Sequence, residues 1–596
     1  MTDQKLENLL NLALVTPENV REKSLNLNVG FEEQTRSWEL IVKYNGNLDG
    51  LRSAGITVEE LLAGYAILQV PENMVDYVAQ RPEIEYVEKP KRLFFAVEEG
   101  KEASCILPVT LREPYLDGSG VIVAVIDSGI DYTNPLFRNE DGSSRIMYLW
   151  DQTIEPDEVL GRKPPAGFRL GTEFDNNQIN AALAASAREE AYMLLPSRDV
   201  SGHGTAVAGI AAGSADGYVG VAPKSNLIIV KLGLPNELSF PRTTELMRAL
   251  TYAVKKAQEL SMPVAINLSF GNTYGAHDGT SLLERFVDNV SEVGRCVICV
   301  GSGNEGASAG HVQGNLQDVR GTVQIAELAV AEYETVLNVQ LWKNYVDRYR
   351  IVLRSPSGQE RELPEVTEKK ESFRIDMTDV LVYLGDPKPY TVSQEIYFDF
   401  IPVDEYIAPG IWSFRIEGLD IVTGQYYFYL PSSVVRGSNT RFFGPSPQVT
   451  LTIPSTAQKV ITVGAYDTEY DSYADFSGRG YVYPERTLGP VAAGATKPDL
   501  AAPGVNIMAP DVYGGFSAFT GTSFATPFVT GAAALMMQWG IVLGNDKFLY
   551  GEKVKAYLRA GAQPIRGESI YPNERVGFGK LCLASSIPGA GLFIGR

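Results

Sequence analysis

Short apolar runs alternate with stretches of helical periodicity between residues 118 and 300, and this alternation restricts the fold more than any other feature of the sequence. A strand that is apolar along its whole length must be buried on both faces, as in a parallel sheet with helices on both sides. The runs are residues 121–126, 227–231, 263–268 and 297–300, with a helical window at 244–260. We therefore expect an α/β fold with a mostly parallel sheet.

The pattern changes between about residues 318 and 450, where strands follow one another almost without helical periodicity. Residues 336–341, 350–353, 395–401 and 425–430 are such strands, separated by Gly and Pro turns, which favours an antiparallel sandwich. The α/β pattern resumes at residues 460–463 and in a helix from near Ser523 to about Trp539. We thus predict a β-sandwich at 318–450, inserted between two parts of the α/β domain at 101–317 and 451–596.

The first hundred residues predict a small α+β unit. Residues 38–44 and 84–88 alternate like strands, whereas 58–62 and 71–77 look helical. The charged stretch 98–102 then breaks the pattern and indicates a linker open to cleavage. Because one core stops growing near ~250–300 residues, a chain of 596 residues is expected to hold two to four cores.

The charge balance and the apolar content exclude some partners. The chain has 52 basic and 72 acidic side chains, and a net charge of −20 repels phosphate backbones and anionic lipids, so we expect no nucleic acid partner. No run approaches the ~18–20 apolar residues of a membrane span, and the N-terminus opens with an acid and no basic region. We therefore expect no membrane span, no export signal and synthesis in the cytoplasm.

Four cysteines are too few for a disulfide framework, which agrees with folding in a reducing compartment. Cys296 and Cys299 form a C-x-x-C pattern, but they lie in an apolar run typical of a buried strand, so we interpret them as inert core thiols. No second C-x-x-C, paired histidine or D-x-D-x-D-G loop completes a metal ligand set. The sequence thus predicts no metal and no cofactor.

Three polar residues stand where a predicted strand ends or a predicted helix begins. Asp127 ends the first apolar run, His203 lies between two glycines, and Ser523 directly precedes the last apolar helix. Sites form at the carboxyl edge of a parallel sheet, and a helix N-terminus offers N–H groups and a positive dipole end to an oxyanion. All three residues are therefore candidates for catalysis.

Together, these residues supply a serine nucleophile, a histidine general base and an aspartate that holds the imidazole tautomer. Their order along the chain, Asp then His then Ser, is the subtilisin order and differs from that of α/β-hydrolases and chymotrypsin-like enzymes. Taken singly, the Asp or the Ser is explained as a cap and the His as a loop residue. All three structural explanations must hold at once to defeat the catalytic interpretation.

The chain resembles the subtilisin family of serine proteases in five segments, residues 125–130, 201–209, 267–271, 300–306 and 521–527. The resemblance implies that Asn304 is the side-chain donor of the oxyanion hole, beside the Ser523 N–H. The residues that it implies for substrate binding are Ser269, Phe270, Gly271, Ser302 and Gly303. Residues 301–306 also satisfy G-x-G-x-x-G, but residues 307–314 are too broken by glycine for the helix that a dinucleotide site needs.

The whole layout is similar to that of the clostridial Csp germination proteases, in which a jelly-roll domain occupies the insertion and a propeptide, here residues 1–100, can stay bound after self-cleavage. The resemblance implies an endopeptidase that cuts a protein substrate, a pro-form cortex-lytic hydrolase, in germinating spores. The same layout also fits a relative with no part in germination, and the motifs do not separate the two. We expect a monomer that cuts itself between about Phe95 and Ser104, with the propeptide tail in its cleft.

The resemblance leaves one function of another class open, because some Csp relatives have lost triad residues and act as signalling proteins. This chain would then be a catalytically restrained germinant sensor or scaffold, although its intact triad favours activity. Family members often bind structural calcium on irregular loops, and the sequence leaves that open as well.

Overall fold

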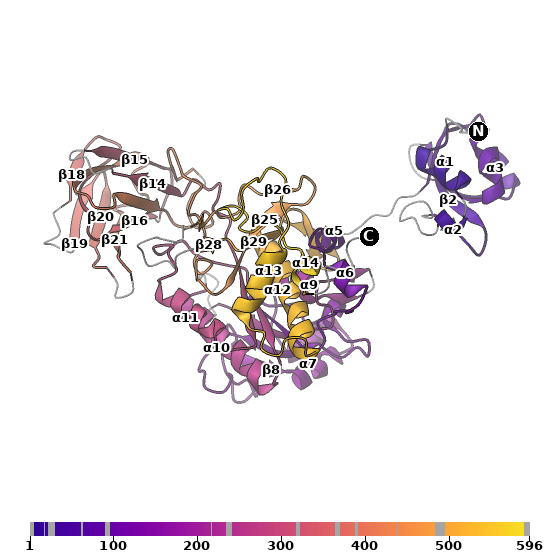
Figure 1. Ribbon diagram of the computed structural model, residues 1–596, viewed down its shortest axis with the longest axis horizontal. Helices are drawn as coiled ribbons and strands as arrows, with labels where there is room; N and C mark the ends of the chain where they lie inside the picture. The colour runs from indigo at the N-terminus through magenta and orange to yellow at the C-terminus, as the bar shows by residue number, and fades with distance from the viewer. Residues whose placement is uncertain are drawn as a thin grey trace. The chain divides into compact units, whose positions relative to one another are not determined.

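The structure is a computed structural model that describes residues 5–16, 18–21, 30–60, 64–89, 96–215, 217–233, 241–316, 322–335, 337–363, 370–387, 391–437, 439–482 and 495–588. The chain divides into two compact units, Met1–Phe94 and Phe95–Arg596, and each is described by itself (Figure 1).

The smaller unit is a mainly antiparallel α+β fold. Its sheet has the order β1-β2-β4-β3, with β5 also paired to β2, and its helices complete a core around Trp38, Leu40 and Leu68. The elements are α1 (Asn8–Val15), α2 (Glu18–Arg21), β1 (Phe31–Glu32), β2 (Ser37–Tyr44), α3 (Asp49–Ser53), β3 (Thr57–Glu60), β4 (Tyr65–Pro71), η2 (Glu72–Met74), α4 (Val75–Ala79) and β5 (Ile84–Glu88).

The predicted strands and the second predicted helix of this unit are confirmed, but the helix at 58–62 is wrong. Residues 57–60 form the edge strand β3, in which Val58 pairs with Leu68 of β4. Pairing with β4 satisfies the backbone there, and the β-branched Thr57 and Val58 favour a strand. Residues 61–63 lie outside the described residues.

The larger unit contains the predicted parallel sheet. Its order is β26-β25-β13-β12-β6-β11-β7-β8, with β29 also paired to β25, and the pairs are parallel except β25–β26 and β7–β8. Its strands are β6 (Ile122–Asp127), β7 (Ile146–Asp151), β8 (Thr172–Asp175), β11 (Asn226–Lys231), β12 (Val264–Leu268), β13 (Cys296–Gly301), β25 (Ile461–Asp467), β26 (Ser472–Tyr473) and β29 (Leu500–Pro503).

Helices bury both faces of this sheet. Along β6, Val123 and Val125 face a core shared with α9 and α12, and Ile122, Ala124 and Ile126 face a core shared with α10 and α11. The helices of the unit are α5 (Ala96–Ala103), α6 (Leu107–Thr110), η3 (Pro135–Phe137), α7 (Asn176–Leu183), α8 (Arg188–Leu194), α9 (His203–Ala212), α10 (Thr243–Glu259), α11 (Leu282–Ser291), α12 (Thr522–Met537), η4 (Gln538–Val542), α13 (Gly551–Gly561) and α14 (Leu583–Ser586).

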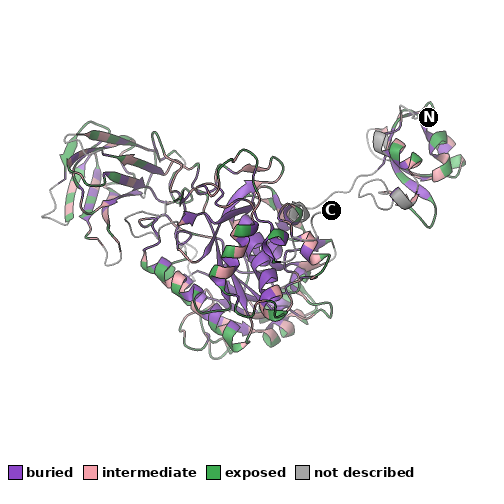
Figure 2. Ribbon diagram, in the orientation of Figure 1, coloured by how far each residue is buried: buried purple, intermediate pink, exposed green. Residues whose placement is uncertain are grey.

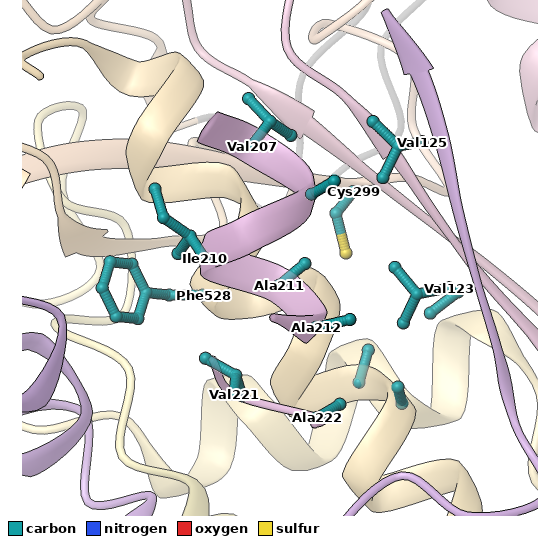
Figure 3. Close-up of a cluster of buried hydrophobic side chains, with 14 of the residues drawn as sticks. Val123, Val125, Val207, Ile210, Ala211, Ala212, Val221, Ala222, Cys299 and Phe528 are labelled. Carbon is teal, nitrogen blue, oxygen red and sulfur yellow. The ribbon is translucent and has the colours of Figure 1, made fainter. Parts of the chain in front are cut away.

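The two helix layers differ in burial. Figure 2 shows α12 as almost entirely buried, whereas α10 and α11 carry exposed residues along one side. In Figure 3, Val207, Ala211 and Ala212 of α9 lie beside Val123 and Val125 of β6, and Phe528 of α12 lies beside Ile210. Small side chains let α9 and α12 pack closely together and on the sheet.

The apolar helix α12 differs from the expectation that no run of the sequence approaches the length of a membrane span. Residues Thr522–Val542 are the one stretch within the described ranges that is long and apolar enough to cross a membrane, and 83% of its apolar window is buried inside the protein. This burial identifies the stretch as a core helix.

The start of the larger unit also differs from expectation, because the predicted linker at 98–102 is part of α5. A Cβ on Gly100 would overlap the ring of Phe528, and Lys101 is 6% exposed and donates to the Val219 carbonyl (2.9 Å). One face of this charged helix is therefore buried, and the unit boundary lies after Phe94 and not at residue 100. Phe95, the start of the predicted cleavage window, lies outside the described residues.

The expectation of cysteines that are all reduced is wrong for one pair, because Cys105 and Cys582 form a disulfide across 477 residues of sequence. Beside it, the Leu583 N–H donates to the Ser104 carbonyl (2.9 Å). Cys296 and Cys299 are unpaired and buried in β13, as expected of core thiols, and burial raises the pKa of each to about 12.

The described residues between 311 and 442 form two antiparallel sheets that face each other across a core rich in aromatic side chains; we call them the β-sandwich. The sheets have the orders β14-β23-β16-β21-β20-β19 and β18-β17-β22-β15-β24. The strands are β14 (His311–Asn315), β15 (Val323–Val330), β16 (Leu337–Asn344), β17 (Arg348–Arg354), β18 (Glu360–Glu362), β19 (Lys370–Ile375), β20 (Thr378–Leu384), β21 (Ser393–Pro402), β22 (Gly410–Asp420), β23 (Gln425–Tyr429) and β24 (Arg441–Phe442). The sandwich thus begins with β14, earlier than the expected residue 318.

Short two-stranded pairs complete the larger unit: β9 (Ser214–Ala215) with β10 (Tyr218–Val219), β27 (Tyr481–Val482) with β28 (Thr496–Lys497), and β30 (Ile507–Pro510) with β31 (Phe516–Phe519).

Candidate functional site

Asp127 and His203 meet at the carboxyl edge of the parallel sheet. Asp127 is the last residue of β6, and His203 is the first residue of α9, which packs on that strand. The His203 Nδ1 lies 2.7 Å from the Asp127 Oδ1, which also accepts from the Ser128 N–H (2.7 Å). This bond orients the imidazole and leaves its Nε2 for another partner.

The pKa of His203 reflects two opposed effects. Burial disfavours the charged imidazolium and would lower the pKa, but the charge and the hydrogen bond of Asp127 outweigh burial. The result is a pKa above the ordinary value of histidine. The Asp127 Oδ2 is buried without a hydrogen-bond partner among the described residues, which leaves carboxylate charge to act on the imidazole.

Asp199, which the sequence analysis did not identify, fixes the turn that carries His203. Its Oδ1 accepts from the Ser128 hydroxyl (2.8 Å) and the Gly202 N–H (3.0 Å), and its Oδ2 accepts from the Thr205 N–H (2.8 Å) and hydroxyl (2.7 Å). These bonds cap the start of α9 and join it to the end of β6. An acid four residues before the histidine was the available signal in the sequence.

Ser523 lies in the first turn of α12, where backbone N–H groups lack partners inside the helix. Its hydroxyl donates to the Ser269 carbonyl (2.9 Å), and the Ser269 hydroxyl donates back to the Ser523 carbonyl (2.9 Å). The ring of the next residue, Phe524, is centred 5.3 Å from the His203 ring, so the helix start faces the imidazole. Between the described residues Ser523 and His203 there is no hydrogen bond, so the hydroxyl must leave Ser269 to reach the imidazole.

Asn304 lies on the other side of the start of α12, in the loop that follows β13. Its Oδ1 accepts from the Thr522 N–H (3.0 Å) and hydroxyl (3.1 Å). These bonds turn the carboxamide so that its Nδ2 donors remain for a ligand. A substrate oxygen at this place would meet the Asn304 amide and the Ser523 N–H together.

The predicted substrate-binding residues form two walls beside Ser523. Ser269, Phe270 and Gly271 follow the end of β12, where Phe270 packs against the α10–α11 core. Ser302 and Gly303 follow β13: the Ser302 N–H donates to the Val463 carbonyl (2.9 Å), and the Gly303 N–H donates to the Thr522 hydroxyl (3.2 Å). The nine predicted site residues thus lie at or just after the ends of β6, β12 and β13 and at the starts of α9 and α12.

No dinucleotide-type helix comes after residues 301–306, since the described residues beyond them lead into strand β14. Within the described ranges, no group of three or more His, Cys, Asp or Glu side chains is arranged to hold a metal ion.

The β-sandwich contacts the residues that follow both walls of the site. On one side, the Glu305 carboxylate accepts from the Ser432 hydroxyl (2.6 Å) and from the N–H (3.1 Å) and hydroxyl (3.1 Å) of Ser433. On the other, the Thr273 hydroxyl donates to the Leu430 carbonyl (2.9 Å). The sequence showed no motif for these contacts, because they join segments more than a hundred residues apart.

Comparisons with known proteins agree with this fold. The model of the Csp protease B prodomain matches residues 4–91, and the model of the Subtilase family matches residues 118–368 and 434–579. Among solved structures, the chain is similar to the Clostridium perfringens CspB protease, with 34% sequence identity and a TM-score of 0.73, over 82% of this chain and 96% of that chain.

Curated relatives are similar over smaller parts. Serine protease AprX of Bacillus subtilis is 34% identical over 168 residues, which are 24% of this chain and 33% of AprX. The PII-type proteinase of Lactococcus lactis subsp. cremoris is 23% identical over 517 residues, 80% of this chain and 25% of that protein. The chain thus spans a quarter to a third of the length of these relatives. The family matches, together with the fold, show that this chain belongs to the subtilase family of serine proteases and carries an N-terminal Csp protease B prodomain.

Proposed function

We propose that this chain is a serine endopeptidase that cuts itself behind its prodomain and then cuts a protein substrate. The observation that carries the proposal is the Asp127–His203 contact of 2.7 Å beside a serine in the first turn of α12. This arrangement supplies a nucleophile, a base and an orienting carboxylate at one place.

In the proposed mechanism, the Ser523 hydroxyl leaves the Ser269 carbonyl and donates to His203 Nε2. The oxygen attacks the scissile carbonyl carbon while the imidazole takes the proton, and Asp127 stabilises the imidazolium. Asn304 Nδ2 and the Ser523 N–H hold the oxyanion. His203 then protonates the leaving amine, and water hydrolyses the acyl-enzyme by the reverse proton transfers.

An active-site-directed fluorophosphonate tests this function directly. We expect one adduct per chain, on Ser523, after the purified protein is treated and its peptides are analysed by mass spectrometry. A folded protein that takes no label, alone or after its prodomain is removed, would contradict the proposal.

One observation favours the second candidate, a catalytically restrained germinant sensor or scaffold. In this structure the Ser523 hydroxyl donates to Ser269 and not to the histidine. If that bond persists in solution, the chain binds and signals without cutting. The same fluorophosphonate experiment separates the two functions, because a restrained serine reacts slowly while the fold stays intact.

We further propose that the N-terminal unit, Met1–Phe94, acts as a propeptide whose tail occupies the cleft, and that the β-sandwich at 311–442 is a jelly-roll domain. The prodomain match and the two facing antiparallel sheets support these assignments. After self-cleavage, the prodomain and the catalytic part should co-elute on size exclusion as an inhibited monomeric complex. A catalytic part that elutes free of the prodomain would show that the tail does not hold the cleft.

The proposed substrate is a pro-form cortex-lytic hydrolase cut during spore germination, with synthesis in the cytoplasm and association with spores. Similarity to the CspB protease over nearly all of that protein supports this role. The test mixes the processed protein, freed of its prodomain, with the pro-form hydrolase of the same cells. Its conversion should require Ser523, and an intact pro-form after prolonged incubation with enzyme that takes the fluorophosphonate label would exclude this substrate.

A further inference from the structure

The position of the nucleophile defines where one substrate side chain must lie. The Ser523 hydroxyl is 2.9 Å from the Ser269 carbonyl, and Asn304 lies against the preceding residue on the other side. The acyl-side residue, the one whose carbonyl carbon is attacked, has its Cα one bond from that carbon. Its side chain therefore enters the space between the wall at 269–271 and the wall at 302–304.

Thr452 fills the inner end of that space. A Cβ on Gly271 would lie 2.5 Å from the Thr452 Oγ1, and a Cβ on Gly303 would lie 2.6 Å from the same oxygen and would overlap the Thr452 Cγ2. Both walls thus carry glycine where they approach one threonine side chain. Thr452 is 6% exposed, so little of the space beside it remains open to solvent.

Backbone hydrogen bonds hold Thr452 and its neighbour between one wall and the residue that follows the other. The Thr452 N–H donates to the Ser302 carbonyl (3.0 Å). The next residue, Ile453, exchanges two hydrogen bonds with Asn272, of 2.8 and 3.0 Å. A side chain on a backbone tied to Ser302 and Asn272 cannot withdraw to admit a larger substrate group. In a site packed this closely, added methylene groups force costly shifts of their neighbours.

We propose that Thr452 restricts the acyl-side residue of the substrate to small side chains such as alanine, glycine or serine. This inference rests on the proposed endopeptidase function and adds its side-chain preference. It also selects the self-cleavage site. Four small residues lie between 90 and 104. Gly100 packs on Phe528, Ala103 packs against a core cluster, and Ser104 is fully buried. Ala96, at the start of α5, is therefore the favoured acyl-side residue for self-cleavage.

The experiment follows self-cleavage of the full chain by intact mass. The wild type should be cut after Ala96. Ala96→Phe should slow cleavage at this bond at least tenfold, whereas Ala96→Gly should keep it within about threefold. Adding Thr452→Gly to Ala96→Phe should restore most of the rate, because it reopens the space. Thr450→Ala, a change at a buried threonine two residues away that touches neither wall glycine, should not restore it.

A wild-type cut after Leu93, Phe94 or Phe95, or an unchanged rate for Ala96→Phe, would overturn the inference. If Thr452→Gly lowers the melting temperature too far, Thr452→Ala provides the smaller change in the same background, and its failure to restore any rate in a folded protein also counts against the inference. Fluorophosphonate labelling separates this outcome from failure of the proposed function. If Ser523 is labelled but the protein cuts itself after a bulky residue, the endopeptidase function stands and only the role of Thr452 is excluded.

Discussion

The α/β part and the β-sandwich of the larger unit bury their cores in different ways. Around α9 and α12 the core consists largely of Ala, Val and Gly, which lets two helix starts approach the ends of β6 and β12 closely. The sandwich instead packs large rings, with Phe414 centred 5.0 Å from both Phe398 and Phe428. Close packing of small side chains in the α/β part positions backbone and polar groups at the site. Packing of large rings stabilises the β-sandwich, which contacts the loops beside the site.

Ser523→Ala tests the role of the α/β part in catalysis, and we expect it to have the largest effect on self-cleavage. We expect self-cleavage to stop and a full-length chain of about 65.1 kDa to remain, because no other described residue occupies the nucleophile position. Intact mass spectrometry shows whether the chain has been cut. Cleavage near residue 96 in this variant, with contaminating proteases excluded, would place the chemistry elsewhere.

Asn304→Ala should give the next largest effect, a decrease of roughly 10² to 10³ in the rate of self-cleavage. The amide interacts with the oxyanion mainly in the transition state, so the fold should not change. The rate is followed by mass, and circular dichroism of the variant must first match the wild type. An unchanged rate would assign the loop after β13 another role.

Glu305→Gln tests the point where the two regions meet. The carboxylate holds Ser432 and Ser433 and lies next to Asn304 in the chain, so the weaker amide should loosen the oxyanion loop and slow self-cleavage about three- to tenfold. Glu334→Gln is the matched control, because Glu334 is also buried and binds Gly437 but does not touch that loop. Equal losses in both variants would mean that the sandwich acts only through stability.

The pH profile of self-cleavage should show the raised pKa of His203. The base must be neutral, and Asp127 favours the charged imidazolium, so the rate should rise with pH to a midpoint above about 6.5, the ordinary pKa of histidine. Conversely, the ion pair stabilises the fold at low pH, and that contribution is lost as the pH rises through the raised pKa. Rates of self-cleavage measured from pH 5 to 9 give this midpoint. A midpoint below the ordinary pKa of histidine would contradict the contact between Asp127 and His203.

Phe414→Ala should have the smallest effect on the rate. Removing this buried ring should cost about 3 to 5 kcal/mol of stability, while the protein that remains folded should cleave itself within about twofold of the wild-type rate. Ile411→Ala, at a position 51% exposed on the same strand, should leave both quantities nearly unchanged. A large loss of rate at full folding would make the sandwich a part of the catalytic machinery.

Much of this arrangement could be predicted because it is local in the sequence. A fully apolar strand such as β6 predicts burial on both faces, and the polar residue at its end predicts a site at the sheet edge. The same holds for His203 and Ser523, since each marks a helix start within its own segment. For these residues the neighbouring sequence is enough to predict their place in the site.

The features that could not be predicted depend on contacts between distant segments. The stretch 98–102 is charged like a linker, yet Gly100 fits against Phe528, and that fit requires the folded core. Asp199 is visible in the sequence as an acid near His203, but no sequence pattern distinguishes it from an acid on the surface. Thr452 acquires its place only because two glycines more than a hundred residues upstream leave room for it.

The disulfide between Cys105 and Cys582 has a consequence for the mature protein. If the prodomain is cut off near residue 96, residues 105–582 of the remaining chain are enclosed in one covalent ring. A single nick by another protease anywhere within that ring would open it without releasing a fragment. Two nicks, or reduction of the disulfide, would be needed before a piece could separate, so on a gel nicked molecules would run as intact ones until a reductant was added.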